Sequence, residues 1–283
     1  MKKILRQLVE SLVKIPHLRG RYRLVDTFGK WVAPEIILRK TINGVVIPLD
    51  QRLRASRYMY YGLYEEQNLK FLKSMIAPGD IVIEPGANIG YITAHLAGWV
   101  GPEGRVFALE PSPTCLNQLK KSIDDAGLPQ ITLLPMAIAD KAGKMTFNDT
   151  PRAISRGYAA LSVVSKPKDG IAAEVEVTSI DDLCMEYGIE QLRFLKLDIE
   201  GAELLALKGS EKMLSKGAIN YVLVETTISE SNVSYNQEMI DLLNSYHYVS
   251  HKVDFSGNLI PFEIDVRKSM REDIIWSYQG ANS

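Results

Sequence analysis

Two kinds of hydrophobic spacing alternate along most of this chain, and together they predict an α/β fold. Short apolar runs indicate buried strands at residues 81–84, 105–109, 131–136, 194–197 and 221–224. Helical periodicity is found at residues 91–100, 114–126, 180–187, 202–214 and 237–245. Strands that alternate with helices in this way favour a mostly parallel sheet with helices on both faces. Two further strands are expected near residues 248–253 and 274–278, and Ser179 is placed to cap the helix at 180–187.

The pattern before residue 76 is different. Apolar residues recur at helical spacing over residues 4–12. Strands at 35–40 and 45–49 are joined by Asn43-Gly44, a strong hairpin signal. A tyrosine-rich stretch from Tyr58 then leads into a helix through Ser74. We therefore divide the chain into an N-terminal cap, residues 1–75, and a main domain, residues 76–283.

A long polar segment interrupts the alternation. Strands expected at 144–148 and 174–178 flank residues 150–171, which have little periodicity. A loop of this length inside a compact domain is usually a lid, a binding loop or a disordered stretch.

Composition narrows the class of protein. The chain has 283 residues, and a hydrophobic content of 46% is enough for a sizeable core. A formal net charge of -1 gives no support to bulk attraction to nucleic acid. Cys115 and Cys184 form no disulfide framework and no CxxC pair, so we expect reduced thiols and a cytoplasmic location. No apolar run is long enough to span a bilayer.

The N-terminal helix is basic as well as amphipathic. Its basic side chains are Lys2, Lys3, Arg6 and Lys14, and three arginines follow at 19, 21 and 23. One interpretation is peripheral contact with an anionic membrane surface. The other is that the helix packs on the main domain or on a partner subunit.

The strongest chemical signal is a glycine turn after the first strand of the main domain. That strand ends on Glu84, and Gly86 and Gly90 follow before a helix whose N-terminus can lie against a polar ligand. The next strand ends on Glu110, about 20 residues past the glycine turn, where nucleotide-binding α/β folds hold a ribose.

The details of this turn disfavour phosphate-bearing cofactors. The dinucleotide fingerprint needs glycines where this chain has Asn88 and Tyr91, and no phosphate-cradling GxxxxGK[ST] loop occurs. A ligand with a ribose and a base but no phosphates, such as S-adenosylmethionine, fits instead. The alternatives are an NAD-dependent oxidoreductase that uses Glu110 for the ribose, and a non-catalytic binding module.

Each residue of the turn has an expected role toward S-adenosylmethionine. Glu84 would meet the ammonium group, the two glycines would allow close approach, and Glu110 would bind the ribose diol. Ala137 and Ile138 would line the adenine. Asn88 either contacts the cofactor or stabilises the helix start.

Several of these segments resemble the FkbM family of methyltransferases. They are Glu84–Tyr91, Ala108–Pro113 and Leu195–Glu203, together with Tyr61–Glu65. The resemblance covers roughly residues 40 to 250, and Glu84-Pro85 departs from the family's usual Asp and aliphatic residue. It implies methyl transfer from S-adenosylmethionine, usually to a hydroxyl of a sugar, glycan or polyketide-like acceptor. It also implies a Rossmann-like class I methyltransferase fold, with a seven-stranded sheet whose last strand is antiparallel.

A hydroxyl acceptor needs a base near the reacting methyl group. Asp198 is the first candidate for base or acceptor-orienting group, and it also belongs to the expected cofactor site; Glu225 is the second. Glu200 fits a helix N-terminal charge, and Lys196 fits a salt bridge to a neighbouring carboxylate. Acids at one rim could instead hold Mg²⁺ or Ca²⁺. We expect no metal, because no dense ligand cluster is visible in the sequence.

The acceptor should be recognised by residues outside the cofactor site. Tyrosines stack on sugar faces and arginines pair with acidic groups. The candidates are Tyr61, Tyr64, Arg57, Arg156 and Tyr158. The competing interpretation is that the tyrosines only pack the cap against the core.

Overall fold

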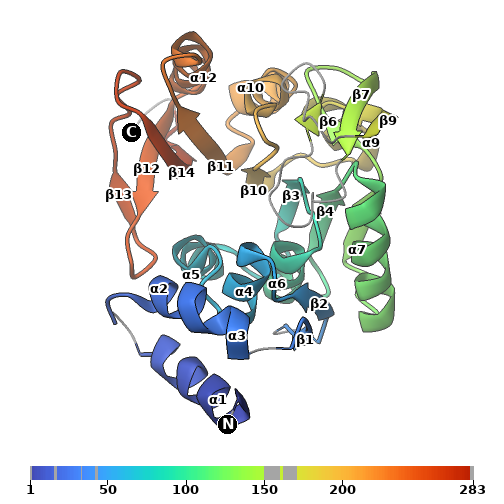
Figure 1. The fold of residues 1–283 in the computed structure, drawn as a ribbon. Helices are drawn as coiled ribbons and strands as arrows, with labels where there is room; N and C mark the ends of the chain where they lie inside the picture. Colours follow the sequence, from blue (N-terminus) through green and yellow to red (C-terminus); the bar gives the residue numbers. More distant parts are fainter. Residues whose placement is uncertain are drawn as a thin grey trace.

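The computed structural model describes residues 2–15, 18–32, 34–41, 44–149, 160–161 and 171–280. At its centre is an eight-stranded sheet in the order β13-β12-β14-β11-β10-β3-β4-β5 (Figure 1). The strands are β3 (Ile81–Pro85), β4 (Arg105–Leu109), β5 (Ile131–Leu134), β10 (Leu192–Leu197), β11 (Ile219–Ile228), β12 (Tyr248–Val253), β13 (Leu259–Pro261) and β14 (Met270–Tyr278). The predicted α/β class is confirmed.

The direction of the strands follows the expected Rossmann-like scheme. β5, β4, β3, β10 and β11 pair in parallel, and β14 pairs antiparallel with both β11 and β12. The expected count of seven strands is one too low. The eighth, β13, is three residues long and pairs only with β12 at the edge of the sheet. A strand so short, and ending on a proline, has no periodicity by which the sequence could reveal it.

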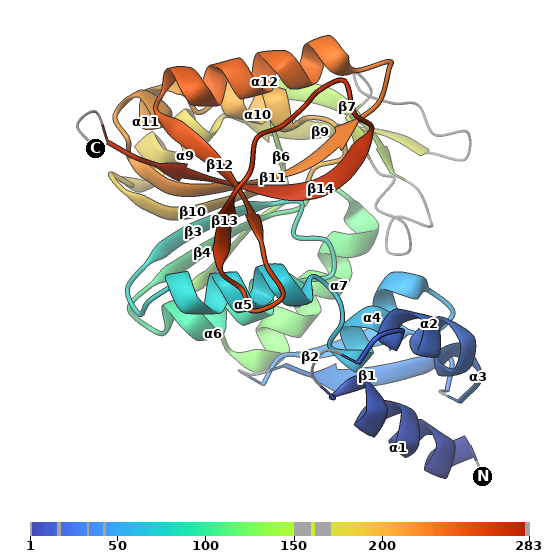
Figure 2. The ribbon, with the colours of Figure 1, turned by 90° about the vertical axis from the view of Figure 1, so that its left-hand side faces the viewer.

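Helices cover both faces of this sheet (Figure 2). One face carries α9 (Ile180–Tyr187), α10 (Glu203–Lys208), α11 (Glu211–Ser215) and α12 (Val233–Ser245); the other carries α5 (Glu66–Met75), α6 (Tyr91–Val100) and α7 (Pro113–Ala126). Alternate strand residues explain the two layers. In β11, Val222 and Val224 join the core under α9–α12, whereas Leu223 joins the core under α5 and α6.

One predicted helix is divided in the structure. The expected helix at 202–214 forms α10 and α11, separated by Gly209 and Ser210. A Cβ at Gly209 would lie 2.3 Å from the carbonyl oxygen of Ala139, so only glycine permits this approach of two backbones. The break therefore depends on a contact that is distant in sequence.

A smaller sheet lies beside the main one. It has the order β6-β9-β7-β8, formed by β6 (Ala137–Ile138), β7 (Gly143–Asp149), β8 (Ala160–Leu161) and β9 (Ile171–Thr178). β6 follows β5 directly and pairs in parallel with β9. Ala137 and Ile138, which were expected to line the adenine, are thereby held in a two-residue strand.

The N-terminal region forms a set of short elements at one end of the molecule (Figure 2). They are α1 (Lys2–Val13), α2 (Arg21–Leu24), the π-helix η1 (Val25–Gly29), α3 (Lys30–Val32), the hairpin β1 (Ile36–Lys40) and β2 (Val46–Asp50), and α4 (Arg54–Tyr61). α1 buries Val9 and Val13 against Val25, Tyr61 and Leu63. None of the helices in the described ranges is long and apolar enough to cross a membrane.

Ser179 offers a direct test of the local reasoning. Its Oγ accepts a hydrogen bond from the Asp182 amide at 3.0 Å, as predicted for the cap of α9. Replacing Ser179 with alanine should lower the free energy of unfolding by about 1 kcal/mol, and Ser179→Asp should restore most of it. Denaturant unfolding measures both. Ser215→Ala, at an exposed serine that caps no helix, is the matched control and should change stability by less than about 0.5 kcal/mol.

Candidate active site

A cavity of about 940 Å³ opens at the carboxyl ends of the parallel strands. It lies where the order of the sheet reverses, between β3, which leads outward to β4 and β5, and β10, which leads to β11. Ligands of open α/β sheets bind at this switch point. The volume is at the upper end of the usual range for small-molecule sites, about 300–1,000 Å³. There is room for more than one small ligand.

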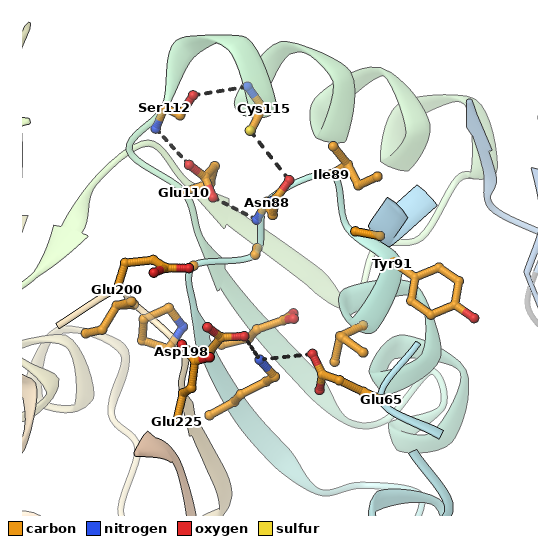
Figure 3. Close-up of a pocket in the computed structure, with 18 of the residues that line it drawn as sticks. Glu65, Asn88, Ile89, Tyr91, Glu110, Ser112, Cys115, Asp198, Glu200 and Glu225 are labelled. Carbon is orange, nitrogen blue, oxygen red and sulfur yellow. Dashed lines mark hydrogen bonds and ion pairs between the residues drawn. The ribbon is translucent and has the colours of Figure 1, made fainter. Parts of the chain in front are cut away.

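At one end of the cavity, backbone amides hold the carboxylate of Glu110. Oε2 accepts from the Asn88 amide at 2.7 Å and Oε1 accepts from the Ser112 amide at 2.8 Å (Figure 3). The side chain of Glu110 is buried and lines the cavity. These two bonds fix the carboxylate at the place where the sequence predicted a ribose-binding acid.

Asn88 serves the turn. Its φ of 51° is in the left-handed region, which asparagine tolerates better than most residues. Its amide holds Glu110, and its Oδ1 accepts from the Cys115 thiol at 3.6 Å. Of the two expected roles, the turn role is the one visible in these contacts, although Asn88 also lines the cavity.

The two glycines are needed for reasons that differ from the expected ones. A Cβ at Gly86 would lie 2.4 Å from the carbonyl oxygen of Asp198, so glycine lets the loops after β3 and β10 meet. Gly90 begins α6 with φ 83°, and a Cβ there would lie 2.3 Å from Leu119 of α7. Gly86 lines the cavity, but Gly90 is not among its lining residues and supports helix packing instead.

Glu84 is the most unusual group in the cavity wall. It is 2% exposed, and its Oε2 has no hydrogen-bond partner among the described residues. Burial raises the pKa of this carboxyl to about 8. A buried acceptor without a partner is costly, so the geometry suits a cationic ligand at this point.

A buried lysine stands at the middle of the site. The Nζ atom of Lys196 lies 2.8 Å from Oδ2 of Asp198 and 3.8 Å from Oε1 of Glu65. Burial alone would lower the pKa of Lys196, but these two acids raise it well above its usual value. In return, Lys196 lowers the pKa of Asp198 against the effect of burial. The predicted salt bridge of Lys196 is confirmed, and Asp198 is a carboxylate.

Glu225 and Glu200 complete the acidic side. Burial, with Asp198 next in size, raises the pKa of Glu225 to about 7, although Arg271 contacts its Oε1 at 2.6 Å. Burial also raises the pKa of Glu200 to about 8. Asp198, Glu200 and Glu225 each present an oxygen within 4.8 Å of the others, a spacing that could hold a divalent ion. Acids at one rim were expected from the sequence, but this close spacing of three of them goes against the reason given for expecting no metal, namely that no dense ligand cluster is present.

Glu225 lines the cavity at the carboxyl ends of the strands, as expected, but for a different structural reason. The sequence suggested a strand that ends at 224, but β11 continues to Ile228. Its parallel pairing with β10 ends at Leu197 and Val224. Glu225 is therefore the first residue beyond that pairing, and its strand continues against β14 alone.

The candidate acceptor residues divide into three groups. Tyr64 lines the cavity and meets Tyr91 edge to face, with ring centroids 5.7 Å apart. Arg57 also lines it, but its guanidinium donates to the carbonyl oxygens of Gln51 and Arg52, which gives it a structural role. Tyr61 was a candidate for acceptor contact, but it is buried in the cluster around α1 and does not line the cavity. Arg156 and Tyr158 lie outside the described residues.

Comparison with known proteins decides the family. The model of the methyltransferase FkbM domain matches residues 84–250, more than half of the chain, from the glycine turn to β12. This chain belongs to the FkbM methyltransferase family. Its cofactor is S-adenosylmethionine, and the NAD-dependent and non-catalytic alternatives are set aside.

Individual relatives of this FkbM methyltransferase are distant. It is 23% identical to 2-O-methyltransferase NoeI of Sinorhizobium fredii, over 74% of this chain and 90% of that protein. It is 26% identical to hexuronic acid methyltransferase AglP of Haloferax volcanii, over 57% of this chain and 62% of that protein. The crystal structure of methyltransferase FkbM from Methylobacillus flagellatus KT is 16% identical and aligns with a TM-score of 0.44, over 79% of this chain and 54% of that one.

Three residues in the site of this FkbM methyltransferase, Glu65, Arg271 and Asp273, were not predicted from the sequence. Glu65 adopts φ 46° at the start of α5, and its sequence neighbours give no sign of this. Arg271 and Asp273 reach the cavity because β14 pairs with β11, with Glu225 opposite Asp273. Their signal exists only once the strand register is known.

The buried carboxyl of Glu84 makes a signed prediction for the ligand-free protein. Its pKa is about 8 when folded and 4.5 when unfolded, so the folded state holds a proton that the unfolded chain releases between these values. Stability should therefore fall as the pH rises from about 5 to 8. Glu84→Gln should remove this loss and raise the free energy of unfolding at pH 8 by roughly 2 kcal/mol, with little change at pH 5.

Thermal unfolding at the two pH values measures the effect. Glu103→Gln, at an exposed glutamate, is the control and should leave the pH dependence unchanged. A Glu84→Gln variant that is less stable than the parent protein at pH 8 would contradict the burial argument.

Proposed function

We propose that this FkbM methyltransferase methylates a hydroxyl group on a sugar, a glycan or a natural product with similar hydroxyls. The observation that carries the proposal is one cavity lined by two chemically different sets of acids. Glu84 and Glu110 suit a cationic ligand with a ribose. Asp198, which interacts electrostatically with Glu84, and Glu225 suit a reaction that needs a proton acceptor.

The residues present fit the cofactor. The partnerless oxygen of Glu84 would accept from the ammonium group, and the amide-held carboxylate of Glu110 would accept from the ribose hydroxyls. Ala137 and Ile138 line the same cavity and would contact the adenine. When bound, the cofactor supplies an electrophilic methyl group on its sulfonium sulfur.

Asp198 and Glu225 would act as a coupled base. Lys196 keeps Asp198 ionised, and the negative charge of Asp198 helps to hold the pKa of Glu225 near 7. A base with a pKa close to the working pH is the most effective for general base catalysis. The pair can take the proton of an acceptor hydroxyl while Arg271 stabilises the charge of Glu225.

The acceptor class rests on the cavity wall and on the names of two relatives. NoeI is a 2-O-methyltransferase and AglP is a hexuronic acid methyltransferase. In this chain, the tyrosine ring of Tyr64 and the exposed guanidinium of Arg54 line the cavity. An aromatic face and a cation suit a sugar ring that carries a carboxylate or a similar acidic group.

The first test concerns cofactor affinity. Glu110→Ala should raise the Kd for S-adenosylhomocysteine about 10–100-fold, because hydrogen bonds to a charged group are worth about 1.5–3 kcal/mol. Isothermal titration calorimetry measures this. Glu103→Ala is the matched control, since Glu103 is exposed and outside the cavity. Unchanged affinity in Glu110→Ala would rule out the ribose role of this carboxylate.

The second test concerns the base, with methyl transfer from a radiolabelled donor to a panel of sugars and uronic acids. Glu225→Gln should lower kcat about 10²–10⁴-fold and keep S-adenosylhomocysteine affinity within a few-fold. In the parent enzyme, kcat should rise with pH through about 7 as Glu225 loses its proton, and Glu225→Gln should lack this limb.

Asp198→Asn should also lower kcat, and it should shift the pH profile, because the charge that raises the pKa of Glu225 is gone. A kcat that neither substitution changes would refute the base assignment. Activity that is lost with EDTA and restored with Mg²⁺ would replace it with a metal held by Asp198, Glu200 and Glu225.

A further inference from the structure

Exposed apolar side chains are concentrated in the first 46 residues of the chain, and none of them lines the cavity. Among the described residues, fourteen large hydrophobic side chains are exposed, and ten of them lie within residues 4–46. Isolated exposed apolar residues are normal on a protein surface, but such a concentration indicates an interaction site. Six of the ten define what we call the N-terminal apolar surface: Ile4, Leu8, Phe28, Trp31, Ile36 and Leu38.

The rest of the protein buries only some of the apolar side chains of helix α1. Successive residues of a helix are about 100° apart, so Val9 and Val13 lie on one side and Ile4 and Leu8 on another. Val9 and Val13 are each 1% exposed, whereas Ile4 is 72% and Leu8 is 53% exposed. The second apolar stripe of α1 therefore faces away from the protein.

Neighbouring elements extend this surface. α1, α3 and β1 lie at the same end of the molecule (Figures 1 and 2), and η1 contacts both α1 and α3. Trp31 is 54% exposed in α3. Ile36 and Leu38 are alternate residues of β1, so they share its outward face, and they are 61% and 70% exposed.

The charge of this region is opposite to that of the remaining chain. Residues 1–40 contain ten Lys and Arg but only three Asp and Glu, whereas the whole chain has a formal net charge of -1. Arg19, just before α2, and Arg23, within it, are both exposed. Basic residues beside exposed aliphatic side chains and a tryptophan match the two layers of a membrane surface, anionic headgroups above an apolar interior.

We propose that the N-terminal apolar surface, with its flanking basic residues, binds the surface of an anionic lipid bilayer. A second copy of the chain is a poorer occupant. A two-fold contact would bring the same basic patch face to face with itself, and like charges repel. Nucleic acid would match the positive charge, but it would leave the aliphatic side chains without an apolar partner.

The test uses the full chain in a flotation assay with two kinds of vesicle. One kind is phosphatidylcholine alone, and the other is phosphatidylcholine with phosphatidylserine. The protein should float with the anionic vesicles at low ionic strength and not with the neutral ones, and salt should weaken the binding.

Two independent pairs of substitutions locate the contact. Arg19→Ser with Arg23→Ser should weaken binding about 30-fold, since each basic residue at the surface is worth about 1 kcal/mol. Leu8→Glu with Trp31→Glu should weaken it at least about tenfold by removing apolar burial. Met185→Glu and Lys216→Ser are matched controls, exposed elsewhere on the main domain, and should bind as the parent protein does.

Circular dichroism and S-adenosylhomocysteine binding show that each variant is folded. Should the glutamate pair unfold the region, the exposed arginine pair still decides the outcome. Lack of binding to anionic vesicles by the parent protein overturns the proposal, as does binding that both pairs retain. Self-association that the variants abolish, without vesicle binding, also overturns it and identifies a contact between copies of the chain.

Discussion

The structure depends on one buried positive charge. Lys196 projects from the centre of the sheet, where its strand neighbours Leu195 and Leu197 pack on the opposite face. A buried ammonium without partners would be very costly, so acids must come to it. Asp198 comes from the end of its own strand, and Glu65 comes from the segment that joins α4 to α5. One ion-pair network thus joins the N-terminal region to the sheet and places the catalytic candidates around the cavity.

The cavity holds more acidic groups than Lys196 and Arg271, which pair with Asp198 and Glu225, can neutralise. Glu84, Glu200, Glu225 and Asp273 all line the same cavity, and burial raises the pKa of each. The ligand-free protein is therefore held in a state where several carboxyls compete for protons and cations. A ligand that carries positive charge relieves this competition. Because it binds the folded protein in preference to the unfolded chain, binding should stabilise the fold. The buried carboxyls that lower the stability of the ligand-free protein are therefore the same groups that would recognise a cationic ligand.

The sequence predicted the regular elements well because their signals are local. The bounds of α6, β4 and α9 match the predicted ranges, since apolar periodicity and a serine cap mark them without tertiary information. Glu84, Glu110 and Asp198 were expected in one site for the same reason, because each sits at or directly after the end of a buried strand, and all three line one cavity. The predictions failed where a distant contact decides the structure. The break at Gly209 depends on the carbonyl of Ala139.

The same distinction explains the site. Sequence spacing suggested that the glycine turn exists to admit the cofactor, yet Gly86 is first needed to let the loop after β10 approach. That approach brings Asp198 beside the turn and makes one cavity of two strand ends. Asp273, which the sequence did not suggest, enters only because the antiparallel register of β14 places it opposite Glu225. A chemical pair of this kind is a property of strand pairing, so it cannot be read from the spacing of residues along one strand.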